Sequence, residues 1–169
     1  MKGRFVLDIG GYIGDTALYF ISKGGKRVIA YEAFPYSYNI ALNNAIQNNL
    51  RDRIEMNNCA VGGVDSYITI DPDYINNNGS KAISQNYGVK IPIISLKTIV
   101  KKYDINGWAL KMNCEGCEYD VFENTDLNTL RKFSEIYMHY HGSPSPLILK
   151  LGQAGFKIKL GEYIHATKM

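Results

Sequence analysis

Short apolar runs alternate with helical repeats along most of the chain. Runs rich in β-branched and aromatic residues predict buried strands, and apolar residues three or four positions apart predict amphipathic helices. The predicted strands are residues 5–7, 27–31, 54–61, 108–112 and 136–140, followed by a hairpin of 155–160 and 163–167. The predicted helices are residues 16–23, 33–49, 95–103, one through 119–122, and 144–153. This alternation predicts an α/β fold: a mostly parallel sheet with helices on both faces and an antiparallel strand near one edge.

The pattern changes between residues 66 and 94, where the helical period disappears. Residues 67–70 and 91–94 are predicted to be short strands, and the polar, glycine-containing run 76–80 between them has the composition of a turn. We interpret 66–94 as an insertion that carries a mobile loop and helps to form the acceptor pocket. No repeat or linker divides the chain, so residues 1–169 are predicted to form a single domain.

Composition supports a globular domain. The chain has 169 residues, of which 46% are hydrophobic and 21% charged. No apolar run approaches the roughly 20 residues of a membrane helix, and the N-terminus lacks the apolar segment of a signal peptide. We therefore expect a cytoplasmic protein without a membrane partner. Its net charge of +3 is spread along the chain, which does not favour a nucleic-acid interface.

The chain has three cysteines, Cys59, Cys114 and Cys117. An odd number argues against a disulfide framework, and disulfides are rare in the cytoplasm. The sequence therefore predicts reduced thiols.

A glycine-rich stretch, 8–16, connects the first predicted strand to the first helix and reads D-I-G-G-Y-I-G-D-T. A tight turn of this kind needs glycine, both for its backbone angles and for close approach of a ligand. The spacing of Gly10, Gly11 and Gly14 fits neither the dinucleotide fingerprint nor a P-loop. Asp8, at the end of the strand, would repel a pyrophosphate but attract an ammonium and a sulfonium. The stretch therefore predicts an S-adenosylmethionine site.

Two further strand ends extend this site. Glu32 ends the second predicted strand about twenty residues later, at the acidic position that binds ribose hydroxyls in doubly wound sheets. Asn58, Cys59 and Ala60 lie towards the end of the third, where the adenine would sit.

Five segments, in order, carry a resemblance to a known family: 6–15, 30–35, 58–62, 110–118 and 151–156. Among them, the run L-K-M-N-C-E-G-C-E at 110–118 has the most family-specific pattern. The chain resembles the FkbM family of S-adenosylmethionine-dependent methyltransferases. This resemblance implies the Rossmann-like class I methyltransferase fold with a seven-stranded sheet. It also implies methyl transfer to a hydroxyl of a sugar or of another small or polymeric acceptor.

The resemblance also assigns parts of the cofactor to residues. Asp8, Gly10 and Gly14 would hold the methionine part, Glu32 the ribose, and Cys59 with Ala60 the adenine. The full set of candidate cofactor residues is Asp8, Gly10, Gly11, Tyr12, Gly14, Asp15, Thr16, Glu32, Ala33, Asn58, Cys59 and Ala60.

The chain departs from the family pattern on the side where the acceptor would bind. The family generally has aspartate where this chain has Asn113, and an acidic residue where it has His139. The chain also begins at its first strand, without the segment that often covers the cofactor in this fold. We therefore expect an open pocket, or one completed by a second copy of the chain.

Two residues are candidates for the catalytic base, Glu115 and His141, because both follow central strands. Asn113 is a candidate for orienting the acceptor by hydrogen bonds. The structural alternatives are that Glu115 is a carboxylate favoured by a helix N-terminus and that His141 is a hydrogen-bonded loop residue.

Two other functions compete with methyl transfer. Asn113 and the missing N-terminal cover are compatible with a non-catalytic S-adenosylmethionine-binding or assembly module. A zinc site could use the ligand types present at the ends of the fourth and fifth strands, namely Cys114, Glu115, Cys117, Glu118, His139 and His141. A single C-x2-C pair is a weak metal signal, so we predict no metal ligands.

Overall fold

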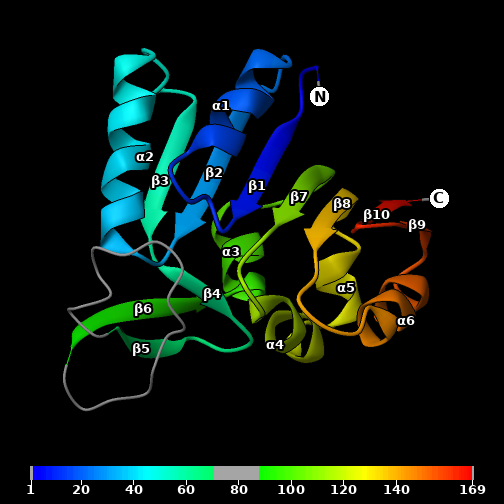
Figure 1. Cartoon of the computed structure of the whole chain (residues 1–169). Helices are drawn as coiled ribbons and strands as arrows, with labels where there is room; N and C mark the ends of the chain where they lie inside the picture. Colours follow the sequence, from blue (N-terminus) through cyan, green and yellow to red (C-terminus); the bar gives the residue numbers. More distant parts are fainter. Residues whose placement is uncertain (1, 71–87, 169) are drawn as a thin grey trace.

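A seven-stranded sheet dominates the computed structural model, which describes residues 2–70 and 88–168 (Figure 1). Its strands are β1 (Phe5–Ile9), β2 (Arg27–Glu32), β3 (Ile54–Asn58), β7 (Trp108–Met112), β8 (Phe133–His139), β9 (Phe156–Leu160) and β10 (Tyr163–Lys168). They lie in the order β3-β2-β1-β7-β8-β10-β9. Neighbouring strands are parallel except that β10 runs antiparallel to β8 and β9. The predicted parallel sheet with a terminal hairpin is confirmed.

The helices follow the predicted alternation. They are α1 (Asp15–Ser22), α2 (Pro35–Gln47), α3 (Leu96–Lys102), α4 (Cys117–Asn124), α5 (Leu127–Leu130) and α6 (Ser145–Gln153). Local chemistry sets several boundaries: Pro35 occupies the first position of α2, and the Ser95 hydroxyl accepts a bond from Thr98 N at the start of α3. The one-turn helix α5 was not predicted. Among the described residues, no helix combines the length and apolar character needed to cross a bilayer.

The strands bury side chains on both faces. On one face, Leu7 and Ile29 belong to a core cluster that includes residues of α3, α4, α5 and α6. On the other, Val6 and Val28 pack with α1 and α2. Alternate residues of a strand point to opposite faces of the sheet. Both the residues on one face and those on the other are apolar only where helices cover both faces. The helices thus cover both faces, as predicted.

The predicted strand 54–61 is corrected by the structure, because it divides at Cys59 into β3 and β4 (Ala60–Gly62). Cys59 N donates to Glu32 O at 3.1 Å, at the end of the β2–β3 ladder, and the chain then leaves the main sheet. β4 pairs with β6 (Val89–Ser95), which pairs with β5 (Ser66–Ile70). β5 and β6, at the two ends of the predicted insertion, therefore join β4 in a second, three-stranded sheet beyond the ends of β2 and β3 (Figure 1). The predicted turn 76–80 lies outside the described residues.

Candidate functional site

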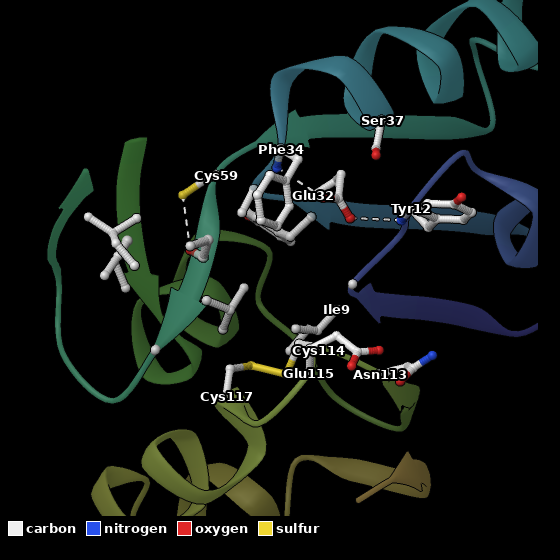
Figure 2. A pocket seen from close by; sticks show the side chains of 18 of the residues that line it. Ile9, Tyr12, Glu32, Phe34, Ser37, Cys59, Asn113, Cys114, Glu115 and Cys117 are labelled. Atoms are coloured by element: carbon white, nitrogen blue, oxygen red, sulfur yellow. Dashed lines mark hydrogen bonds between the residues drawn. A yellow bond between two sulfur atoms is a disulfide. The ribbon is translucent and has the colours of Figure 1, made fainter. Parts of the chain in front are cut away.

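The candidate site is a cavity of about 980 Å³ at the carboxyl ends of β1, β2 and β7 (Figure 2). In open α/β sheets these ends form the ligand side. The second sheet supplies an apolar wall with Ile68, Ile70 and Ile93. The predicted site residues that line the cavity are Gly10, Tyr12, Asp15, Thr16, Glu32, Ala33, Cys59, Ala60, Asn113 and Glu115.

The glycines of the first loop are required by close contacts within the chain. A Cβ on Gly10 would lie 1.8 Å from Asn113 O, so only glycine lets the loops after β1 and β7 pass each other. Gly14 has φ +82 at the start of α1, and a Cβ there would lie 3.2 Å from Ala41 of α2. Gly11 packs against Ala30. Of the three glycines, Gly10 alone lines the cavity, and the other two shape the loop behind it.

Asp8 occupies a different position from the one predicted. It is fully buried, it is not among the described cavity-lining residues, and its Oδ1 lies 2.8 Å from Lys111 Nζ. The register of β1 on β7 pairs these two residues directly. Thr16 Oγ1 donates to Asp8 Oδ2 at 2.8 Å, and Lys111 Nζ donates to Gly10 O at 2.7 Å. In this geometry Asp8 holds the glycine loop in place, and Lys111 neutralises its charge; a contact of Asp8 with the methionine part stays a prediction.

Glu32 faces the cavity with a preorganised carboxylate (Figure 2). Tyr12 N donates to its Oε2 at 2.8 Å, and Phe34 N donates to its Oε1 at 2.9 Å. Burial raises the pKa of the Glu32 carboxyl above its usual value, and the two backbone bonds partly oppose that shift. A carboxylate has about four lone-pair positions, so two accepted bonds leave capacity for ligand hydroxyls.

The wall at the end of β3 also differs in part from the prediction. Cys59, Ala60 and Ala33 line the cavity, whereas Asn58 is not among the described lining residues. Asn58 Nδ2 instead donates to Glu32 O and Ala33 O, each at 3.0 Å, and so ties the loop after β2 to β3. Phe34 lines the cavity but was missed, although its position two residues after Glu32 could have indicated it.

The loop after β7 forms the opposite wall and contains a disulfide between Cys114 and Cys117 (Figure 2). The prediction of reduced thiols is therefore wrong for these two cysteines. Glu115 and Gly116 have φ values of +56 and +108, and the turn they make brings the two Cα atoms to 5.5 Å, within the usual range for a disulfide. Their sulfurs and a Glu118 carboxylate oxygen lie within 4.8 Å of one another, but a disulfide offers a cation no thiolate.

Behind this loop lies a row of three ionisable side chains that joins the two candidate bases. Glu118 is fully buried, and its Oε1 lies 2.7 Å from His141 Nδ1 and accepts a bond from His141 N at 2.9 Å. Its Oε2 accepts a bond from Gly116 N at 3.0 Å. His141 Nε2 lies 3.4 Å from Glu115 Oε2. His141 itself is not among the described lining residues, and it reaches the cavity through Glu115.

Sequence reasoning considered Glu118 only as a motif residue and a metal ligand. Its role as the partner of His141 depends on a contact between residues 23 positions apart, which local spacing does not reveal. The third candidate, Asn113, lies 3.2 Å from His139 Nδ1 through its Oδ1. Asn113 and Glu115 thus line one end of the cavity, and His141 lies behind Glu115.

The FkbM methyltransferase domain model matches residues 8–158, most of the chain. The chain belongs to the FkbM methyltransferase family. This family uses S-adenosylmethionine as its cofactor. No curated protein matches the chain in sequence.

Solved structures share the fold. The FkbM methyltransferase from Methylobacillus flagellatus KT is 17% identical with a TM-score of 0.64, over 97% of this chain and 43% of that one. M. capricolum TrmK, in complex with S-adenosylhomocysteine, is 16% identical with a TM-score of 0.60, over 98% and 62%. Streptococcus pneumoniae Sp1610, a putative tRNA (m1A22) methyltransferase in complex with S-adenosylmethionine, is 14% identical with a TM-score of 0.60, over 99% and 68%. All three share the Rossmann-like class I fold with this chain. This chain spans less than half the length of the first of them, the FkbM methyltransferase from Methylobacillus flagellatus KT.

Proposed function

We propose that the chain binds S-adenosylmethionine in this cavity and transfers the methyl group to a hydroxyl oxygen of a sugar or of another small or polymeric acceptor. The observation that carries the proposal is the Glu32 carboxylate, which two backbone N–H groups hold in place with lone pairs left for ribose hydroxyls. Because the protein fixes the Glu32 carboxylate before the cofactor arrives, cofactor binding does not have to order this side chain.

The charge of the cavity supports a cationic ligand. Among the described lining residues, four are carboxylates and one is an ammonium: Asp15, Glu32, Glu115, Asp120 and Lys111. Lys111 is already paired with the buried Asp8, so its charge is compensated behind the wall. A ligand with an ammonium, a sulfonium and one carboxylate fits this excess of negative charge, whereas a pyrophosphate does not.

The lining supports a division of the cofactor among three walls. Glu32 would accept bonds from the ribose, and the loop of Gly10, Tyr12 and Thr16 would hold the methionine part. Ala33 and Phe34 on one side and Cys59 and Ala60 on the other offer an apolar slot for the adenine. Gly11, Gly14 and Asn58 would act indirectly, because they shape these walls.

S-adenosylmethionine, when bound, supplies a methyl group that is already activated by its sulfonium. The protein must then hold an acceptor hydroxyl and take its proton. We assign the removal of this proton to the Nε2 atom of His141. A carboxylate only accepts hydrogen bonds, so Glu118 places the ring proton on Nδ1 and leaves the Nε2 lone pair free. The Glu115 carboxylate, 3.4 Å from Nε2, would accept a hydrogen bond from a second hydroxyl of the methyl acceptor.

Rings beside this end of the cavity favour a sugar as acceptor. The His139 ring lies 4.6 Å from that of His141 and 5.0 Å from that of Tyr163, and Asn113 lies beside His139. Aromatic faces next to amide and carboxylate groups present apolar and polar contacts together, which suits the mixed surface of a sugar ring.

Methyl transfer from labelled S-adenosylmethionine tests the proposal. The full chain would be assayed with monosaccharides, oligosaccharides, RNA and protein, with calorimetry of S-adenosylhomocysteine run alongside. We expect cofactor binding and an O-linked methyl on a saccharide. Binding without transfer to any acceptor would favour the non-catalytic module, and transfer to RNA or protein alone would correct the acceptor class. Tighter binding of NAD than of either sulfur nucleoside would overturn the cofactor assignment.

A further inference from the structure

The disulfide lies in the wall of the candidate site, where its oxidation or reduction can affect that site. Cys114 and Cys117 are both partly exposed and both line the cavity, on either side of Glu115 (Figure 2). Cys114 belongs to the loop after β7, and Cys117 is the first residue of α4. The sulfurs are therefore accessible from the same space that would hold cofactor and acceptor.

The bridge contributes little to holding the fold together. Its cysteines are three positions apart, so it closes a very small loop and removes little entropy from the unfolded chain. The turn is also held without it, because Gly116 N donates to Glu118 Oε2 at 3.0 Å. Both facts allow the bridge to open while the surrounding structure persists.

The two sulfurs have unlike surroundings. Cys117, at the start of the eight-residue helix α4, is where the helix dipole stabilises a thiolate. The buried Glu118 carboxylate, which disfavours a second negative charge, lies 3.4 Å from Cys114 Sγ through its Oε2 and also within 4.8 Å of the Cys117 sulfur, so the helix dipole is what distinguishes the two. Cys117 is thus the better leaving group in thiol exchange, and Cys114 is the better holder of a proton.

We propose that Cys114 and Cys117 form a reversible redox site that exchanges with a dithiol reductant entering the cavity. A thiolate of the reductant attacks Cys114 Sγ, the disulfide breaks, and Cys117 leaves as a thiolate. The second thiolate of the reductant then displaces Cys114 from the mixed disulfide. The reductant ends as its disulfide, and the two protons that its thiols lost reside on the cysteines or in solvent.

Opening the bridge changes the setting of Glu115. This residue has a left-handed backbone, φ +56, which a non-glycine residue adopts at a cost and keeps only where its surroundings impose it. The bridge across Glu115 and Gly116 is one such constraint, and reduction removes it. The redox state therefore sets how firmly the carboxylate that links the cavity to His141 is held.

Thiol trapping under native conditions tests the redox site without an acceptor or a cofactor. The full chain would be equilibrated in dithiothreitol buffers of increasing reduced fraction, alkylated, digested with trypsin and weighed. Both cysteines fall in one peptide, 112–131, and Cys59 falls in another, 54–81. We expect the first peptide to pass from zero to two alkyl groups in one step.

Single variants sharpen the test. With Cys114→Ser, Cys117 should be alkylated in every buffer, and several-fold faster than Cys114 in the Cys117→Ser variant. Cys59→Ser should leave the two-group step unchanged, because burial raises the pKa of that thiol and it lies on another wall. Alkylation of both cysteines before any reductant is added, or only after denaturation, would overturn the proposal. These outcomes do not depend on whether the chain transfers methyl groups.

Discussion

Two buried carboxylates, Glu32 and Glu118, organise the two halves of the candidate site in similar ways but with different results. Each accepts backbone N–H bonds from loops at strand ends: Glu32 from Tyr12 and Phe34, Glu118 from Gly116 and His141. Glu32 lines the cavity, whereas Glu118 is fully enclosed and holds the ring of His141. The same device thus prepares a direct ligand contact in one half and positions another side chain in the other.

The largest effect is expected where the second half meets the chemistry, at His141. His141→Gln should lower kcat by about 10²- to 10⁴-fold, the range for loss of a general base, with the Kd of S-adenosylhomocysteine within about twofold of the wild type. Turnover with an identified acceptor and calorimetry would measure the two quantities.

The chain offers a matched control for this variant. His165 also pairs with a carboxylate, Glu135, at 2.7 Å, but it lies on β10 and is not among the described cavity-lining residues. His165→Gln should therefore leave kcat nearly unchanged. Equal effects of the two variants would remove His141 from catalysis, and a large loss in Glu115→Gln alone would make Glu115 the base.

The first half should respond in binding instead of turnover. Glu32→Ala removes the acceptor of two backbone bonds and of the ribose hydroxyls. We expect a loss of about 2 to 3 kcal/mol, or about 30- to 150-fold in the Kd of S-adenosylhomocysteine. Glu162→Ala, in the exposed hairpin turn between β9 and β10, is the control and should bind normally. Normal binding by Glu32→Ala would show that the ribose lies elsewhere.

The sequence predicted the first half of the site better than the second because its signals are local. A glycine turn after a strand and an acid at the end of the next strand follow from backbone rules over about thirty residues. The structure accordingly has Gly10 and Glu32 in the cavity wall, and their ligand roles stay predictions. The mostly parallel sheet also follows from the alternation of strands and helices, whereas the order of the strands comes from the structure alone.

What the sequence did not reveal depends on contacts between distant segments. The pairing of Asp8 with Lys111 requires the register of β1 on β7, over 103 positions, and gives Asp8 a structural role that its position in the sequence did not reveal. The pairing of Glu118 with His141 requires the loop after β8 to fold over α4. Spacing along the chain carries no information on such registers.

Glu118 should act through position, with an effect smaller than that of His141. Glu118→Gln keeps the side-chain shape but replaces one carboxylate oxygen with an NH2 group that cannot accept a hydrogen bond. The His141 ring is therefore held less well. We expect kcat to fall about tenfold, or about 1.4 kcal/mol, with the KM for acceptor and the Kd for cofactor nearly unchanged.

A matched change, Glu135→Gln, tests whether any carboxylate partner of a histidine has this effect, although Glu135 is only partly buried. Glu135 contacts His165 and Tyr137, so the Glu135→Gln variant should have unaltered kcat and KM. If Glu118→Gln instead raised KM and Kd together with no change in kcat, its role would be to shape the cavity and not to position the base.

The smallest expected effect is a pH dependence of stability that distinguishes the Glu32 half of the site. Burial raises the pKa of Glu32 in the folded protein above its value of 4.5 in the unfolded chain. Between these two values the native state binds more protons than the unfolded state, so this residue's contribution to stability falls as the pH rises and levels off above the native pKa. Glu32→Gln removes the titration. The free energy of unfolding of the wild type minus that of the variant, measured with urea from pH 4 upwards without cofactor, should therefore decrease with pH and then become constant. A difference that increases over this range would mean that the backbone bonds from Tyr12 and Phe34 outweigh burial and stabilise the ionised carboxylate.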